Sequence, residues 1–171
     1  MAATDYSYPK IYVESKGEPI DASECILELE SLDYLKTSCG AMEGRFRRVF
    51  ARRIYERVHR EVLDLEGGRI KRSYILKTPH DRLYLLVEAG TRVSLVEVAG
   101  RQVHLYCEEG DEVKRGERLA SVITGKLEVR NVRSPDDGVV VLIGEFIETP
   151  ERYVVAIAGG DDVRRITVRE G

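Results

Sequence analysis

The 171-residue sequence predicts a mostly β protein, α+β overall, with a single helix. Short runs of alternating apolar and polar residues, separated by glycine, proline or acidic turns, fill the chain after residue 68. Many such runs at this spacing indicate a sandwich or a barrel. One earlier stretch, residues 45–65, repeats its apolar residues at helical spacing instead. A short internal repeat in the C-terminal half further favours a β domain built from two related units.

An N-terminal strand–helix–strand unit is expected over residues 1–80. The segments 10–14 and 25–30 alternate apolar and polar residues, which predicts strands. Residues 45–65 are predicted to form the helix, because large apolar residues recur every four positions along one face. These residues are Phe46, Phe50, Ile54, Val58 and Val62. A strand over residues 69–77 completes the unit.

A β domain is expected over residues 81–171. Its predicted strands are residues 82–88, 92–98, 102–107, 118–124, 127–132, 138–144, 152–158 and 163–168. Residues 117–125 align with residues 151–159, and residues 99–105 align with residues 137–143. Two related units of this size could each supply half of a quasi-twofold sandwich, because neither could bury its apolar face alone.

Composition restricts the class of protein. With 43% hydrophobic and 33% charged residues the chain can form a core, and its net charge of -3 argues against a basic nucleic-acid coat. No apolar run is long enough to cross a bilayer, and the N-terminus lacks the basic and apolar regions of a signal peptide. We therefore expect a cytoplasmic protein with no membrane partner. Scarce Asn, Gln and Met beside abundant Arg and Glu also indicate a thermophilic source.

Cysteine and histidine give no sign of a metal site or of catalysis. Cys25, Cys39 and Cys107 are odd in number, widely scattered and without a CxxC pair, so reduced thiols are expected. None of the three histidines has the spacing that places two ligands on one helix face. No nucleophile, base and orienting group can be assembled, so we expect neither a catalytic site nor a metal.

Within residues 98–158 the order of features resembles the lipoyl/biotinyl domain family. The segment 103–122 is similar to that family's strand, Gly-Asp-x-Val loop, glycine and leucine-containing strand, and the segment 134–140 is similar to the turn that follows. The matching positions are Gly110, Asp111, Val113, Gly116 and Leu119. Lys126 lies ten residues beyond Gly116, where the family places its modified lysine. The resemblance implies a barrel-sandwich hybrid and makes Lys126 a candidate for covalent attachment of lipoate or biotin.

The residues around Lys126 predict a hairpin independently of the resemblance. Thr124 to Leu127 could close a two-residue hairpin in which Gly125 takes the positive φ of a type II′ turn. Lys126 would then stand at the tip on a flexible stem, with Thr124 and Gly125 beside it as the rest of the candidate attachment site. The flanks contain no methionine, and only Thr124 matches the lipoylated Glu-Thr-Asp pattern. An unmodified lysine at a solvated turn is therefore the preferred interpretation.

The segment 45–60 carries the strongest basic patch. Its candidate partner-binding residues are Arg45, Arg48 and Arg52, whose guanidinium groups suit phosphate and carboxylate oxygens. They make RNA or an acidic protein a candidate partner. A solvated face with local ion pairs is the preferred alternative, because glutamates stand four residues from several arginines.

The β-rich start, the long helix and the lipoyl/biotinyl-like half together resemble a small archaeal family of unknown function. We expect a lipoyl/biotinyl-like protein that acts as a non-catalytic binding or assembly module for a protein partner. Two alternatives stay open: a carrier with lipoate or biotin on Lys126, and an RNA- or acidic-partner-binding protein that uses the arginines of the 45–65 helix. Homo-oligomerisation is also left open.

Overall fold

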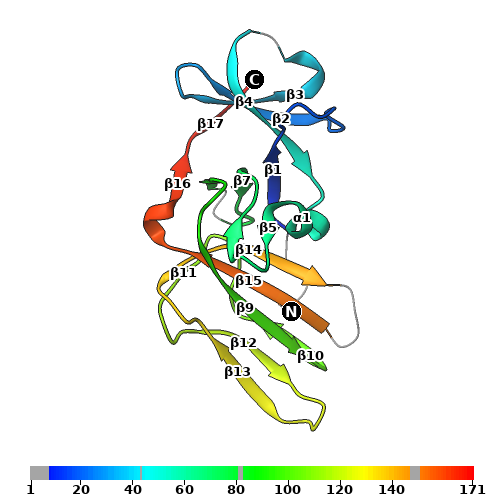
Figure 1. The fold of residues 1–171 in the computed structure, drawn as a ribbon, viewed down its shortest axis with the longest axis vertical. Coiled ribbons are helices and arrows are strands. Elements are labelled where there is room, and N and C mark those ends of the chain that lie inside the picture. Colours follow the sequence, from blue (N-terminus) through cyan, green and yellow to red (C-terminus); the bar gives the residue numbers. More distant parts are fainter. Residues whose placement is uncertain (1–7, 43, 81–82, 147–150) are drawn as a thin grey trace.

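The computed structural model describes residues 8–171 apart from 43, 81–82 and 147–150. Strand content is 55% and the described residues contain one short α-helix, so the mostly β class is confirmed. A near-closed eight-stranded barrel lies at one end, and a curled half-barrel, the C-terminal β unit of residues 93–158, lies at the other (Figure 1). The first residue of the predicted strand 82–88 lies outside the described residues.

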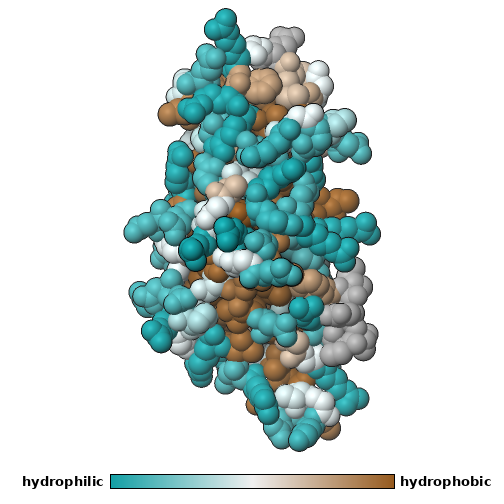
Figure 2. All heavy atoms as spheres, in the orientation of Figure 1, coloured by the Kyte–Doolittle hydropathy of each residue, from teal (hydrophilic) through white to brown (hydrophobic). Residues whose placement is uncertain are grey.

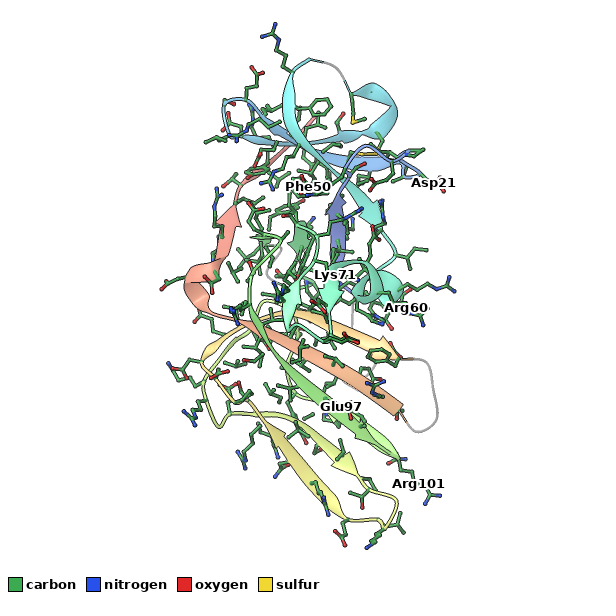
Figure 3. The ribbon with its side chains drawn as sticks, viewed as in Figure 1. Asp21, Phe50, Arg60, Lys71, Glu97 and Arg101 are labelled. Carbon is green, nitrogen blue, oxygen red and sulfur yellow. A yellow bond between two sulfur atoms is a disulfide. The ribbon has the colours of Figure 1, made fainter. Side chains whose placement is uncertain are left out.

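The N-terminal barrel is one sheet whose two edges approach each other. In spatial order its strands are β16 (Val163–Ile166), β8 (Tyr84–Val87), β7 (Tyr74–Lys77), β1 (Lys10–Glu14), β4 (Phe46–Arg53), β2 (Glu24–Leu29), β3 (Tyr34–Ser38) and β17 (Val168–Glu170). β16 and β17 occupy opposite edges, yet only Thr167 separates them along the chain, so the sheet must curl. The interior is filled by Tyr12, Ile26, Tyr34, Phe50, Ile75 and Leu86. Figure 3 marks Phe50 among these side chains.

The predicted helix over residues 45–65 is wrong over most of its length. Phe46–Arg53 form β4, which pairs with β1 on one side and β2 on the other, and only Tyr55–Val62 form the helix α1. A spacing of four is also a multiple of the strand period of two, so the spacing alone does not distinguish a helix from a strand. Pairing along both edges supplies hydrogen bonds and burial that outweigh local helix propensity.

The C-terminal β unit consists of two sheets that face each other. The inner sheet has the order β11 (Glu112–Val113), β14 (Gly138–Phe146), β15 (Glu151–Ala158) and β9 (Val93–Gly100). The outer sheet has the order β10 (Gln102–Leu105), β12 (Arg118–Ile123) and β13 (Val129–Arg133). Side chains from both sheets form one core cluster. The chain passes from the inner to the outer sheet at Arg101, which Figure 3 labels.

The two copies of the predicted repeat occupy equivalent places in the two sheets. The order β10-β12-β13 of the outer sheet corresponds to β14-β15-β9 of the inner sheet. Gln102 pairs with Ile123, and their aligned counterparts, Val140 and Ile157, pair with each other. A bulge after Val140 then shifts the register of the rest of β14. The aligned segments of the sequence therefore form corresponding strand pairs, β10 with β12 and β14 with β15.

The inner sheet is buried on both faces and joins the two ends of the molecule. Toward the outer sheet it presents Val98, Val140, Ile143, Val155 and Ile157. Toward the barrel and α1 it presents Val141, Leu142, Val154, Ala156 and Ala158. Burial on both faces explains why β14 and β15 are nearly continuous apolar runs rather than alternating ones. At the bulge, the Tyr74 hydroxyl of β7 donates a 2.7 Å hydrogen bond to the Val141 carbonyl.

α1 covers the junction between the barrel and the inner sheet (Figure 1). It approaches β14 closely at Gly144, where an added Cβ atom would lie 3.0 Å from the Cβ atom of His59. The remaining elements are the paired strands β5 (Leu63–Asp64) and β6 (Arg69–Ile70) and the 3₁₀ turns Cys39–Ala41 and Gly160–Asp162. No helix in the described part of the chain has the length and apolar character needed to cross a membrane.

The sheets do not divide at the expected boundary between residues 80 and 81. β7 and β8 lie on opposite sides of this boundary and pair with each other. The C-terminal strands β16 and β17 also pair within the barrel, with β8 and β3. The last residues of the chain therefore return to the N-terminal half, which sequence periodicity alone does not indicate.

The expectation of three reduced cysteines is wrong for two of them. Cys25 and Cys39 form a disulfide, with their Cα atoms 5.1 Å apart. They are separated by 14 residues in sequence, but β2 and β3 form an antiparallel pair that brings them together. The backbone N–H of Cys39 also donates to the Ser23 carbonyl at 3.0 Å. Cys107 is free and buried.

Candidate functional site

The turn between β12 and β13 places Lys126 at an exposed tip, at the end of the molecule away from the barrel (Figure 1). The Thr124 hydroxyl oxygen accepts hydrogen bonds from the backbone N–H groups of Lys126 at 3.3 Å and Glu128 at 3.2 Å. The chain therefore reverses where the sequence predicted, with Thr124 and Gly125 directly beside the exposed amine. Covalent attachment at Lys126 stays a prediction.

The predicted type II′ turn is wrong, although the reversal is in the right place. The residue with positive φ is Leu127, at 63°, and not Gly125. Thr124 and Glu128 close a loop of three residues through two backbone hydrogen bonds of 2.9 Å, Thr124 N–H to the Glu128 carbonyl and Leu127 N–H to the Thr124 carbonyl. A leucine in this conformation costs about 1 kcal/mol. Its side chain is 70% exposed, so packing does not offset that cost.

Arg48, one of the predicted partner-binding residues, is engaged within the barrel. Its guanidinium group donates four hydrogen bonds of 2.7–3.0 Å to the carboxylates of Glu28 and Glu88. The Tyr34 hydroxyl also donates to Glu28, at 2.6 Å. The hydrogen bonds from Arg48 lower the pKa of both carboxyl groups. Arg48 thus has few donors left for a phosphate or an acidic partner.

The three predicted arginines do not form one basic face. Arg48 and Arg52 share a face of β4 but stand roughly 13 Å apart along the strand. Arg52 lies 3.9 Å from the Glu24 carboxylate, and Arg45 is exposed just before β4 begins. The change from helix to strand therefore disperses the basic stripe that the helical spacing predicted.

A cavity of about 710 Å³ lies where the barrel meets the C-terminal β unit. Residues from the start of α1, from β10 and the segment after it, and from β14 and β15 form its walls. Its aromatic residues are Tyr8, Tyr55, Tyr106 and Tyr153, and its acidic residues are Glu56, Glu108, Asp111 and Glu145. His80, His104, Cys107 and three aliphatic residues complete the lining, which contains neither lysine nor arginine among the described residues.

A buried tyrosine–glutamate pair supports one wall of this cavity. The Tyr55 hydroxyl donates to one carboxylate oxygen of Glu109 and accepts the backbone N–H of Ile143 at 2.9 Å. Glu109 is 2% exposed, and its Oε1 atom has no hydrogen-bond partner among the described residues. Burial raises the pKa of Glu109 to about 6, although the hydrogen bond from Tyr55 opposes this shift. The pair ties α1 to the segment after β10 and to β14.

The other titratable groups near the cavity include a buried thiol and a histidine–carboxylate pair. Burial, with smaller contributions from Asp111 and Glu109, raises the pKa of the Cys107 thiol to about 12, so Cys107 is not a thiolate at neutral pH. His80 Nδ1 lies 2.8 Å from a carboxylate oxygen of Glu108. Within the described residues no group of three or more His, Cys, Asp or Glu side chains could hold a metal ion. Beside the cavity the structure therefore places a protonated thiol and an imidazole–carboxylate pair.

The comparisons with known proteins concern the chain as a whole. Residues 6–160 match a family described as an uncharacterized protein conserved in archaea (DUF2118). The chain belongs to this family. No curated protein matches the sequence. The family description names no activity.

Sequence reasoning found the exposed lysine but missed the cavity. Its lining comes from segments around residues 8, 55, 80, 103–111 and 143–153, which only the folded chain brings together. The carboxylates of residues 108–112 fit an exposed turn in the sequence, whereas Glu109 among them is buried. No local signal distinguishes Glu109 from its neighbours, and its hydrogen-bond partner, Tyr55, lies more than fifty residues earlier.

Glu109 should make stability depend on pH in a defined direction. Its pKa is raised from an ordinary value of about 4.3 to about 6, so the folded state holds the proton more tightly. The contribution of protonated Glu109 to the free energy of unfolding is fully present below a pH of about 4.3 and is lost as pH rises through about 6. We expect the stability of the wild type relative to Glu109→Gln to fall by about 2 kcal/mol between pH 4 and pH 7.5. Urea denaturation of both proteins measures this difference, and a difference that does not change with pH would contradict it.

Proposed function

We propose that the protein is a non-catalytic binding module built on a lipoyl/biotinyl-type sandwich, and that it binds a small ligand in the cavity beside α1, β10 and β14. The wall of the cavity is the observation that carries this proposal. It combines tyrosine rings, carboxylates and short apolar side chains in a recess of about 710 Å³, a size typical of small-molecule sites. Burial raises the pKa of Glu109, the acid next to this wall, to about 6, and groups at functional sites often have shifted pKa values.

The pairing of the strands supports the lipoyl/biotinyl-type part of the proposal. Two sheets with corresponding strand order face each other across one core, and the repeat of the sequence maps onto both. The β12–β13 hairpin then presents Lys126 at its tip, the place that the resemblance assigns to the modified lysine. The protein partner of the module would contact this tip, where Leu127 and Val129 are 70% and 71% exposed. RNA is not the preferred partner, because Arg48 is occupied by carboxylates.

A carrier function is the second candidate, and one observation favours it. The backbone around Lys126 is fixed by the hydrogen bonds of Thr124, while its side chain stands in solvent. An attached lipoyl or biotinyl group could swing between two partner active sites from such an anchor. The amine would attack the carboxyl carbon of lipoate or biotin that a ligase has activated as an acyl adenylate, so that an amide bond forms while AMP leaves and the amine loses a proton. The non-catalytic binding module remains the main proposal because the flanks of Lys126 match neither modified type.

Mass spectrometry of protein purified from its natural source tests both candidates in one experiment. A cavity ligand gives an added mass under native conditions that disappears on denaturation, whereas a carrier keeps its added mass in the denatured protein. We expect the first result. A Leu105→Phe variant, which fills part of the cavity, should lose the added mass. The exposed-site control Val129→Ala should keep it.

The outcomes separate the proposals cleanly. An increment that survives denaturation and is removed by Lys126→Ala would establish the carrier in place of the binding module. A bare mass under both conditions, together with no binding of small-molecule probes to the purified chain, would overturn both candidates.

A further inference from the structure

We propose that the ligand of the cavity is an organic ammonium ion, a positively charged amine attached to an apolar group. This inference rests on the proposed function, because it assigns a ligand class to the same cavity. Three features carry it: the tyrosine rings, the carboxylates of the lining, among them Glu56 and Glu145, and the short apolar wall. No one of these features would suffice, since acidic groups alone are common on protein surfaces.

The tyrosine rings provide faces suited to a cation. Tyr8 and Tyr55 lie with their ring centroids 6.1 Å apart and tilted by 46°, so they form a corner rather than a closed stack. Tyr153 lines the same cavity from β15. A cation within about 6 Å of such a ring is attracted by its electron-rich face. The fourth ring, that of Tyr106, is already covered in this way, because the Arg118 guanidinium lies 4.1 Å from its centroid.

The charge of the lining favours a cation over an anion or a neutral ligand. Four carboxylates line the cavity beside two imidazoles, of which that of His80 lies 2.8 Å from Glu108, and no lysine or arginine belongs to the described lining. The negative charge of the lining also affects the pKa values of its tyrosines. Burial first, then the negative charge of Glu145, raises the pKa of Tyr153 to about 12. Burial and the same carboxylate also raise the pKa of Tyr8. A bound ammonium group would relieve this accumulation of negative charge, whereas a bound carboxylate or phosphate would add to it.

The apolar residues indicate that the cation is organic. Val103, Leu105 and Ile143 line the cavity beside the charged and aromatic groups, so part of any ligand would contact hydrocarbon. A metal ion would gain nothing from these contacts, and it would need a closer set of oxygen ligands. No such set is found in the described residues. An amine attached to a ring or a short alkyl chain could contact the tyrosine rings, the carboxylates and the apolar residues of the wall at the same time.

Three matched probes test the inference on the full-length chain. Benzylamine, benzyl alcohol and benzoate share one ring and differ at pH 7 in charge, which is positive, neutral and negative. The chain has nine tyrosines and no tryptophan, so tyrosine fluorescence and tyrosine-ring NMR shifts report binding without interference. We expect benzylamine to bind at least tenfold more tightly than benzyl alcohol, and benzoate to bind most weakly. The preference should decrease as salt rises from 0.05 to 0.5 M.

Charge-neutral variants locate the site. Glu145→Gln and Glu56→Gln should each weaken benzylamine binding about fivefold and leave benzyl alcohol binding unchanged. Glu128→Gln removes the same charge from the distant hairpin and should have no effect. Equal binding of the three probes, or tightest binding of benzoate, would overturn the ammonium inference and leave the proposed binding function intact. A second result would also overturn the ammonium inference and leave the proposed binding function intact. In it, native mass spectra show a cavity ligand that is not an amine, and benzylamine does not bind to the protein.

Discussion

Burial of the inner sheet on both faces is the constraint on which the rest of the structure depends. β14 and β15 turn one set of side chains toward the barrel and α1 and the other set toward the outer sheet. One face of β14 and β15 closes the core shared with the barrel and α1, and the other face closes the core shared with the outer sheet. Neither core would be closed without these two strands. The return of β16 and β17 to the barrel ties the same sheet to the N-terminal half from its other end. Figure 2 shows a mostly hydrophilic surface on which apolar residues gather over the C-terminal β unit.

The candidate site is a consequence of this arrangement. α1 lies against the inner sheet at Gly144, and its first residue, Tyr55, then reaches Glu109 and the backbone of β14. The space left between α1, β10 and the end of β14 is the cavity. Its carboxylates and rings come from both ends of the molecule, so the site exists only when both are assembled. The exposed hairpin with Lys126 is independent of this junction and could be used separately.

Local sequence patterns predicted the elements whose period is unambiguous. The repeat and the position of the hairpin were predictable, because the alternation of residues and the turn signal are local. The prediction of a helix over residues 45–65 was wrong, because a spacing of four fits a strand as well. Pairing with β1 and β2 stabilises the strand β4 in place of the helix. The disulfide of Cys25 and Cys39 and the positive φ of Leu127 depend on contacts across strands. The burial of Glu109 could not be predicted, since its hydrogen-bond partner, Tyr55, lies far away in sequence.

Native-state hydrogen exchange of a Leu142→Ala variant tests the central claim most directly. Leu142 is fully buried in the core that the inner sheet shares with the barrel, and its truncation should cost about 3 kcal/mol. If the inner sheet joins the two ends into one cooperative unit, the slowest amides of β1 in the barrel and of β12 in the outer sheet should lose the same protection. Loss of protection in the barrel with β12 unchanged would show that the two ends unfold independently and would contradict the account.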